Sequence, residues 1–187
     1  MVRSVKFRNA TSKDREAITS LHISVSKQTY SGILPADYLT DRMPEEKTQL
    51  WERRLAQGID PARLALILAE EGSTLAGFAC FVFDDETDFG TYLHNLYVAP
   101  SHQGKGVARG LLAAGVNGFS EERLEQSVHL LTIGENHQAR AFYERLSGRM
   151  VEERQNVMTR QPQVRFVRYQ WPTARALRTA AELSIRP

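Results

Sequence analysis

Residues 96–108 read LYVAPSHQGKGVA: a short apolar strand, then a tight polar turn, then the start of a helix. Small residues occupy the turn and the helix start at Gly104, Gly106 and Ala108. A helix start leaves backbone N–H groups without intrahelical partners, and the helix dipole makes that end positive. Small side chains let an anion approach these donors. The stretch therefore predicts a site for a phosphate or pyrophosphate that is held largely by the main chain.

The elements around this stretch predict a mixed α/β domain with one central sheet. Apolar runs at 64–70 and 74–83 flank the turn Glu71–Gly72 and are typical of an antiparallel hairpin. Further strands are expected near Val5 and Phe7 and over 91–98, 128–133, 149–158 and 164–171, with helices over 12–28, 44–57, 106–119 and 136–146.

The chain length of 187 residues suits a single domain, which we expect over residues 1–171. A helix-prone tail follows over residues 172–187. Packing on the domain, contact with a second copy and fraying all remain open for this tail. Exposed strand and tail surfaces also suit a homodimer.

Composition excludes several classes of protein. The formal net charge of +2 is too small for a nucleic-acid footprint, so no nucleic acid is expected as a partner. No apolar run approaches the roughly 20 residues that span a bilayer, and the N-terminus lacks the apolar centre of a signal peptide. We therefore expect no membrane partner. A single cysteine permits no disulfide within the chain, which fits the cytoplasm.

Three sets of residues are expected to have structural or solvated roles. Cys80 lies in the apolar run 77–83 and is interpreted as a buried inert thiol, with a nucleophile as the alternative. The acidic segment 84–88 lacks the pattern of a calcium loop, so we interpret it as a solvated turn and expect no metal. Four arginines are expected on solvated faces: Arg140, Arg145, Arg149 and Arg154.

Two motifs in fixed order carry a family resemblance. Residues 103–108 (QGKGVA) follow the strand ending at Val98 and look like a Gln/Arg-x-x-Gly-x-Gly/Ala signature. Residues 136–144 (NHQARAFYE) look like an Asn-x-x-Ala-x-x-Phe-Tyr helix. With these motifs and this order of elements, the chain resembles the GNAT superfamily of acetyl-CoA-dependent N-acyltransferases over about residues 5–171. It departs from the common Gly-Phe after the second helix by reading LSGR at 146–149, which we expect to affect packing rather than chemistry.

The resemblance implies the GNAT fold and a site for acetyl-CoA as co-substrate. It implies that backbone N–H groups near 103–108 hold the pyrophosphate, and that strand 96–98 splays from its neighbour so that it can bond the pantetheine arm. Lys105 is expected either to contact a phosphate or to be a solvated lysine of the turn. Asn136 is expected to cap its helix, and its side chain either contacts the cofactor as well or only caps. The residues expected at the cofactor are Leu96, Tyr97, Val98, Gln103, Gly104, Lys105, Gly106, Val107, Ala108, Asn136, Ala139 and Phe142.

Direct acyl transfer to an amine needs proximity, oxyanion stabilisation and proton handling, without a metal. Tyr143 is the candidate acid for the departing thiolate, because a phenol is protonated at neutral pH; the alternative is a packed aromatic ring. The candidate bases are His94 and Tyr92. Simple alternation places both on one strand face with Leu96 and Val98. His94 is expected to titrate in a useful range, or else to be a structural histidine.

The acceptor is expected to be a primary amine of a small molecule or peptide. By analogy with the family, Tyr30, Ile33, Tyr38 and the loop after Val157 form its walls, unless these aromatics seal the core. A non-catalytic acyl-CoA-binding sensor of the same fold is the alternative function. A dinucleotide-binding dehydrogenase is disfavoured, because the third glycine of its fingerprint is missing and the motif lies in mid-chain.

Overall fold

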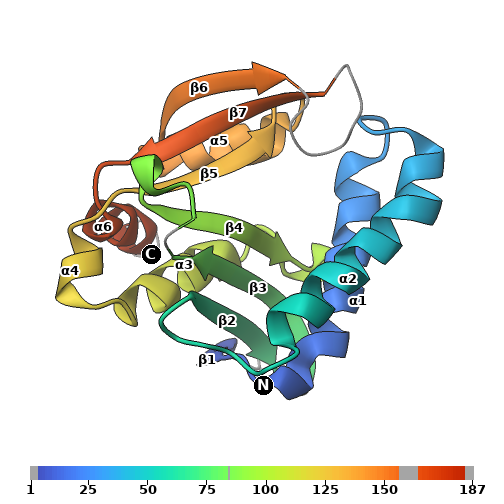
Figure 1. The fold of residues 1–187 in the computed structure, drawn as a ribbon, viewed down its shortest axis with the longest axis horizontal. Coiled ribbons are helices and arrows are strands. Elements are labelled where there is room, and N and C mark those ends of the chain that lie inside the picture. The colour runs from blue at the N-terminus through green and yellow to red at the C-terminus, as the bar shows by residue number, and fades with distance from the viewer. Residues whose placement is uncertain (1–3, 84, 156–163, 184–187) are drawn as a thin grey trace.

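The computed structural model describes residues 4–83, 85–155 and 164–183. These residues form one seven-stranded sheet with the order β1-β2-β3-β4-β5-β7-β6 (Figure 1). Every neighbouring pair is antiparallel except β4 and β5. The strands are β1 Lys6–Asn9, β2 Leu64–Glu71, β3 Thr74–Val82, β4 Thr91–Val98, β5 Val128–Ile133, β6 Arg149–Gln155 and β7 Arg165–Trp171.

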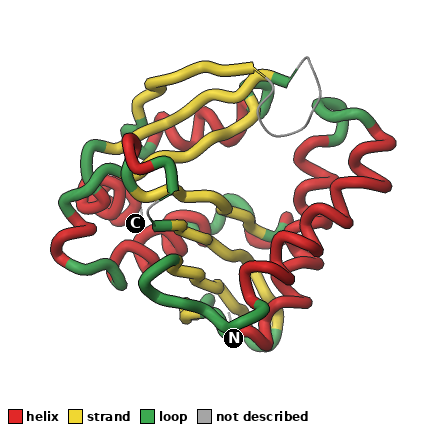
Figure 2. The backbone as a smooth tube through the Cα atoms, in the orientation of Figure 1, coloured by secondary structure: helices red, strands yellow, loops and turns green. Residues whose placement is uncertain are grey.

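The sheet opens between its two central strands. Within the described residues, β4 and β5 pair at Thr91 with Val128 and at Tyr92 with His129, and then separate. The yellow strands in Figure 2 accordingly form two groups that diverge from this junction. One group contains β1, β2, β3 and β4, and the other contains β5, β7 and β6. From Leu93 to Val98, the edge of β4 that faces β5 therefore has backbone groups available for another partner. The expected splay of strand 96–98 is confirmed.

Helices cover both faces of the sheet. α3 and α6 pack on one face in a core that includes Leu111, Leu112 and Leu177, and α1 and α2 pack on the other with Ile18 and Trp51. The helices are α1 Arg15–Tyr30, α2 Met43–Leu55, α3 Val107–Asn117, α4 Glu121–Leu124, α5 His137–Arg145 and α6 Ala174–Leu183. Short helical turns lie at Ser12–Asp14, Tyr38–Arg42, Thr87–Phe89 and Pro100–His102.

The C-terminal helix packs on the domain. Ala174, Leu177 and Ala181 are fully buried in the core that α3 lines, and the Arg109 guanidinium donates to the Ala180 carbonyl at 3.0 Å. The sequence left three alternatives open for the tail: packing on the domain, contact with a second copy, or fraying. Residues 174–183 pack on the domain. The end of the strand expected over 149–158 and the loop after Val157 lie outside the described residues.

A β-bulge changes which side chains of β4 share a face. Phe81 pairs with Leu93 and Cys80 with Asn95, so His94 is the extra residue. Leu93, Leu96 and Val98 consequently pack in the α3 core, whereas Tyr97 packs in the core of α1 and α2. The expectation that Tyr92 and His94 share a face with Leu96 and Val98 is wrong. Strict alternation fails because the bulge adds one residue to the count.

The acidic segment before β4 is tied to the sheet rather than solvated throughout. Arg168 of β7 is fully buried and donates to Glu86 at 2.5 Å and to Glu152 at 2.6 Å. Glu86 also accepts from Arg154 at 3.2 Å, so Arg154 does not point freely into solvent as expected. These ion pairs anchor the loop beside the junction of β4 and β5.

Two further expectations concern single features. Cys80 is fully buried, as expected, and burial raises the pKa of its thiol to about 11, which disfavours the reactive thiolate. No helix in the described ranges combines the length and apolar character needed to cross a bilayer.

Candidate active site

The turn before α3 presents a set of backbone donors. Gly104 and Gly106 have φ values of +73° and +79°, a conformation that glycine adopts without strain. No atom lies within 4 Å of where a Cβ would stand at either position, so the backbone is open to a ligand. Among the described residues, none accepts a hydrogen bond from the N–H groups of 104–109. The geometry fits a diphosphate held at a helix start.

A cavity of about 420 Å³ runs from this turn to the opening between β4 and β5. Its size is typical of sites that bind small molecules. The Gln103 side chain donates to the Val98 carbonyl at 3.1 Å and so ties the turn to the strand end. Of the expected site residues, the cavity is lined by Tyr30, His94, Leu96, Tyr97, Val98, Gln103, Gly104, Gly106, Val107, Ala108, Asn136, Ala139, Phe142 and Tyr143.

Helix α5 positions Tyr143 in this cavity. The Asn136 side chain caps the helix by accepting from the Ala139 N–H at 3.1 Å, as expected, and Asn136 also lines the cavity. At the other end, the Gly148 N–H donates to the Tyr143 carbonyl at 2.9 Å, and the Trp171 ring lies 2.7 Å from where a Gly148 Cβ would stand. The departure from Gly-Phe at 146–149 thus belongs to packing that fixes the end of the helix.

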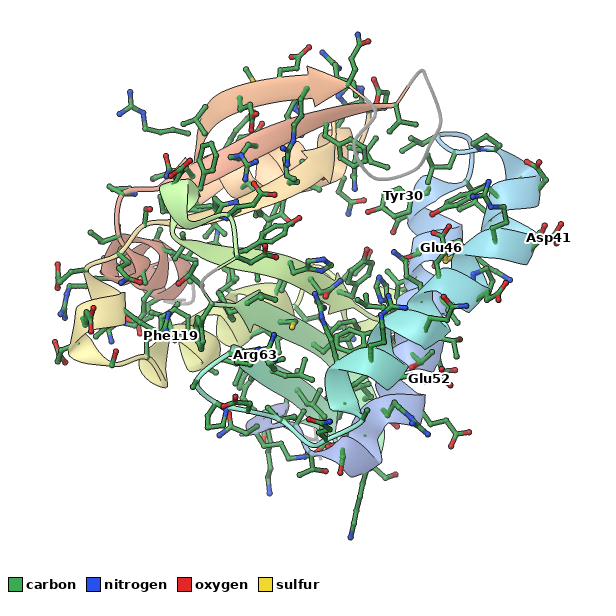
Figure 3. The ribbon with its side chains drawn as sticks, in the orientation of Figure 1. Tyr30, Asp41, Glu46, Glu52, Arg63 and Phe119 are labelled. Atoms are coloured by element: carbon green, nitrogen blue, oxygen red, sulfur yellow. The ribbon has the colours of Figure 1, made fainter. Side chains whose placement is uncertain are left out.

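Three phenols gather in the cavity. Burial raises the pKa of Tyr143, and the Tyr97 phenol raises it further. Burial likewise raises the pKa of Tyr30, with Tyr97 and Tyr143 adding to the effect. Figure 3 shows the Tyr30 ring extending from the end of α1 toward the strands. The Tyr143 and Tyr30 phenols are therefore fully protonated at neutral pH, and Tyr143 has the hydrogen that a leaving thiolate requires.

His94 is held by its neighbour in a single tautomer. Arg54 donates to the Asn95 side-chain oxygen at 2.9 Å, and the His94 Nδ1 lies 3.0 Å from the same oxygen. A guanidinium only donates, so this atom is the amide oxygen and His94 Nδ1 carries the hydrogen. The lone pair of His94 therefore resides on Nε2. Burial and the Arg54 charge lower the pKa of His94 to about 3, so the expected titration near neutral pH is not found.

Comparison with known proteins places this arrangement in a family. The profile of the Acetyltransferase (GNAT) family matches residues 29–148, a range that contains the turn, His94, and the phenols of Tyr30, Tyr97 and Tyr143. The chain belongs to this family. The expectation of a GNAT acetyltransferase, and hence of an enzyme, is confirmed.

Individual relatives agree with the GNAT assignment over nearly the whole chain. The "Uncharacterized N-acetyltransferase YuaI" of Bacillus subtilis is 27% identical over 177 residues, which cover 94% of this chain and 97% of YuaI. The PaiA N-acetyltransferase of Thermoplasma acidophilum, solved with coenzyme A, has a TM-score of 0.67 at 17% identity, covering 90% of this chain and 99% of its own. YncA of Salmonella typhimurium, solved with acetyl-CoA, has a TM-score of 0.60 at 19% identity, covering 90% and 93%.

Four expected site residues do not line the cavity of this GNAT protein. Lys105 is exposed on the turn. Tyr92 stacks on His129, with ring centroids 4.7 Å apart, and burial raises its pKa to about 12. Ile33 and Tyr38 pack in a separate core cluster with Leu34, and the Tyr38 hydroxyl donates to Glu46 at 2.8 Å. Of the three expected acceptor residues, Tyr30 is the one that the fold brings to the cavity.

The sequence interpretation missed two arginines at the cavity. Arg109 and Arg145 line it, and burial together with the Arg145 charge lowers the pKa of Arg109. Arg145 is exposed, as expected, and also lines the cavity. Arg140 was likewise expected on a solvated face, but it is partly buried and donates to the Tyr169 hydroxyl at 3.3 Å. Arg109 lies in the first turn of α3 and Arg145 ends α5, so helical spacing from the two motifs was the available signal.

Proposed function

We propose that this GNAT acetyltransferase transfers an acetyl group from acetyl-CoA directly to a primary amine of a small molecule or peptide. One observation carries the proposal: a single cavity joins the open backbone donors of the turn to the Tyr143 phenol and the His94 imidazole. A donor for an anion, a proton donor and a hydrogen-bond acceptor are the groups that thioester aminolysis needs.

The residues present fit coenzyme A. The N–H groups of 104–109 would hold the diphosphate, and Arg109 and Arg145 would add charge for its phosphates. The unpaired edge of β4 over 93–98 suits the two amides of the pantetheine arm, which pair with a strand edge as a peptide does. When bound, acetyl-CoA supplies the activated acyl group.

Tyr143 would act on the leaving group. As the amine nitrogen attacks, a C–N bond forms, the C–S bond breaks, and the thiolate takes a proton from the Tyr143 hydroxyl. The raised pKa of Tyr143 keeps that proton available at neutral pH. General-acid assistance of this kind contributes about 10²- to 10⁴-fold to a rate.

His94 would act on the nucleophile. The unprotonated Nε2 accepts a hydrogen bond from the amine and so orients its lone pair toward the acyl carbon. With a pKa of about 3, the imidazole does not retain a proton at neutral pH. The proton lost by the amine therefore passes through this site to water, and Tyr143 regains a proton from water after the thiol leaves, so that the two transfers balance. His94 orients the amine rather than storing charge.

A thiol-release assay with acetyl-CoA and a broad panel of primary amines tests the proposal. We expect amine-dependent release of coenzyme A together with the N-acetylated product. Tight binding of coenzyme A without product from any amine would instead indicate a non-catalytic acyl-CoA-binding module.

A further inference from the structure

Two cations lie on the inward face of α2. Lys47 falls between Met43 and Trp51 at intervals of four residues, and Arg54 follows one turn later. Met43 and Trp51 are at most 1% exposed, so this stripe is the buried face of the helix. Lys47 and Arg54 are both partly buried on it. Partly buried cations are normally paired with carboxylates.

Arg54 is fixed in place without a carboxylate. Its guanidinium donates to the Asn95 side-chain oxygen at 2.9 Å and lies 5.4 Å from the centroid of the Trp51 ring. No ion pair joins Lys47 or Arg54 to an acidic residue in the described ranges. The cation is therefore oriented beside the residue that follows His94, with donors left for a ligand.

The electrostatic environment of this wall is uniformly positive. After burial, the charges of Arg54 and Lys47 lower the pKa of His94, and Lys47, His94 and Arg54 lower the pKa of His22; no carboxylate is among these causes. His94 lines the cavity, whereas Lys47 and Arg54 are not among its lining residues. Arg54 adjoins the cavity through its bond to Asn95, the neighbour of His94.

The nearby carboxylates bind other groups or point away from the two cations. Glu46 accepts from the Tyr38 hydroxyl at 2.8 Å, and Asp41 points away from the sheet in Figure 3. Across the opening, Glu86 and Glu152 are held by the buried Arg168. None of these groups neutralises Lys47 or Arg54, so the positive charge is left for a ligand.

We propose that the acceptor amine carries a carboxylate, which Arg54 and Lys47 bind beside His94. This inference rests on the proposed function and names the class of its acceptor. A guanidinium binds a carboxylate through parallel N–H donors, and the lysine adds a second positive charge. A polyamine would place a second ammonium against these cations and is disfavoured by like-charge repulsion.

Three primary amines of similar length test which group the site prefers at the far end of the acceptor. β-Alanine carries a carboxylate there, 3-amino-1-propanol a hydroxyl, and 1,3-diaminopropane a second ammonium. We expect kcat/KM to fall in that order. In Arg54→Gln, which retains an amide donor toward Asn95, the ratio of kcat/KM for β-alanine to that for 3-amino-1-propanol should drop about tenfold to hundredfold, the range for hydrogen bonds to charged groups. Lys47→Gln should lower the same ratio. Arg53→Gln removes an exposed neighbouring charge and should leave it unchanged.

A binding measurement separates failure of this inference from failure of the proposed function. The protein loaded with coenzyme A is titrated with N-acetyl-β-alanine and with N-acetyl-3-amino-1-propanol. We expect the charged product to bind at least about ten times more tightly, and the preference to disappear in Arg54→Gln. Equal affinities, or a kinetic preference for 1,3-diaminopropane, would overturn the carboxylate site and leave acetyl transfer standing. Absence of turnover with every amine would overturn the function, while the titration still decides the site.

Discussion

The Nδ1 of His94 lies 3.0 Å from the side-chain oxygen of Asn95, and this contact sets the tautomer of the imidazole. Arg54 fixes the Asn95 amide by donating to the same oxygen at 2.9 Å. The result is a neutral histidine whose Nε2 is an acceptor. A bulge residue on β4 thus receives its orientation from α2, a helix roughly 40 residues away in sequence.

Asn95→Asp should raise the pKa of His94. A carboxylate beside Nδ1 stabilises the imidazolium, an effect of about one to three pH units, reduced here because Arg54 pairs with the new charge. Histidine titration by NMR measures it, with the wild-type protein as the reference. A His94 titration unchanged from the wild-type protein would show that Asn95 does not control the imidazole.

Tyr143→Phe should lower kcat by about 10²- to 10⁴-fold and change the dissociation constant of coenzyme A by less than about threefold, because the ring remains and the proton is lost. Tyr169→Phe is the matched control. It removes another buried hydroxyl, one that donates to Glu144 at 2.6 Å. Steady-state kinetics and calorimetry give both quantities. Similar turnover in the two variants would remove the catalytic assignment of Tyr143.

Stability should fall as pH decreases from 6.5 to 5. Burial is the main cause that lowers the pKa of His94 to about 3, of His129 to about 4 and of His22 well below 6.5. The unfolded chain binds more protons than the native state in this window, so the free energy of unfolding rises with pH, by up to about 1.4 kcal/mol per pH unit for each histidine.

Urea denaturation at several pH values measures this slope. Asp14 and Glu86 have lowered pKa values, so they also lose stability as pH falls, but mostly below this window, since their ordinary pKa values are 3.8 and 4.5. His137→Gln alters an exposed histidine and should retain the slope. A flat profile between pH 6.5 and 5 is incompatible with three neutral buried imidazoles.

Arg145→Gln should weaken coenzyme A binding by about twofold to fivefold, since an exposed cation at the cavity contributes up to about 1 kcal/mol to an anion contact. The loss should shrink at high salt, because exposed charges are screened. Calorimetry at two ionic strengths tests both points. Arg149→Gln, an exposed neighbour on β6, is the control. Equal effects of the two substitutions would indicate general attraction rather than a contact.

Local patterns predicted much of the fold. The hairpin of β2 and β3, the strand–turn–helix around Gly104 and the cap at Asn136 depend on residues that are close in sequence. For the same reason the residues around Gly104 predict an anion site from sequence alone. The short helix α4 and the turn at Tyr38–Arg42 lacked a strong periodic signal and were not predicted.

Long-range packing determined what the sequence did not predict. The bulge at His94 arises from the pairing of β4 with β3, and it reverses the faces of Leu96 and Val98. Ile33 and Tyr38 were expected to contact the acceptor by analogy with the family. They instead bury themselves against β5 and β7 residues such as Ile133. The pattern of apolar residues within one helix or strand does not indicate which distant segment that element packs against.

The central claim is that backbone amides of the turn bind the diphosphate of acetyl-CoA. A ¹⁵N-resolved NMR titration with coenzyme A tests it residue by residue. We predict saturable binding, with the largest downfield shifts at the amides of residues 104–109 and smaller changes along 93–98. Absence of binding, or shifts concentrated away from this turn, would contradict the account.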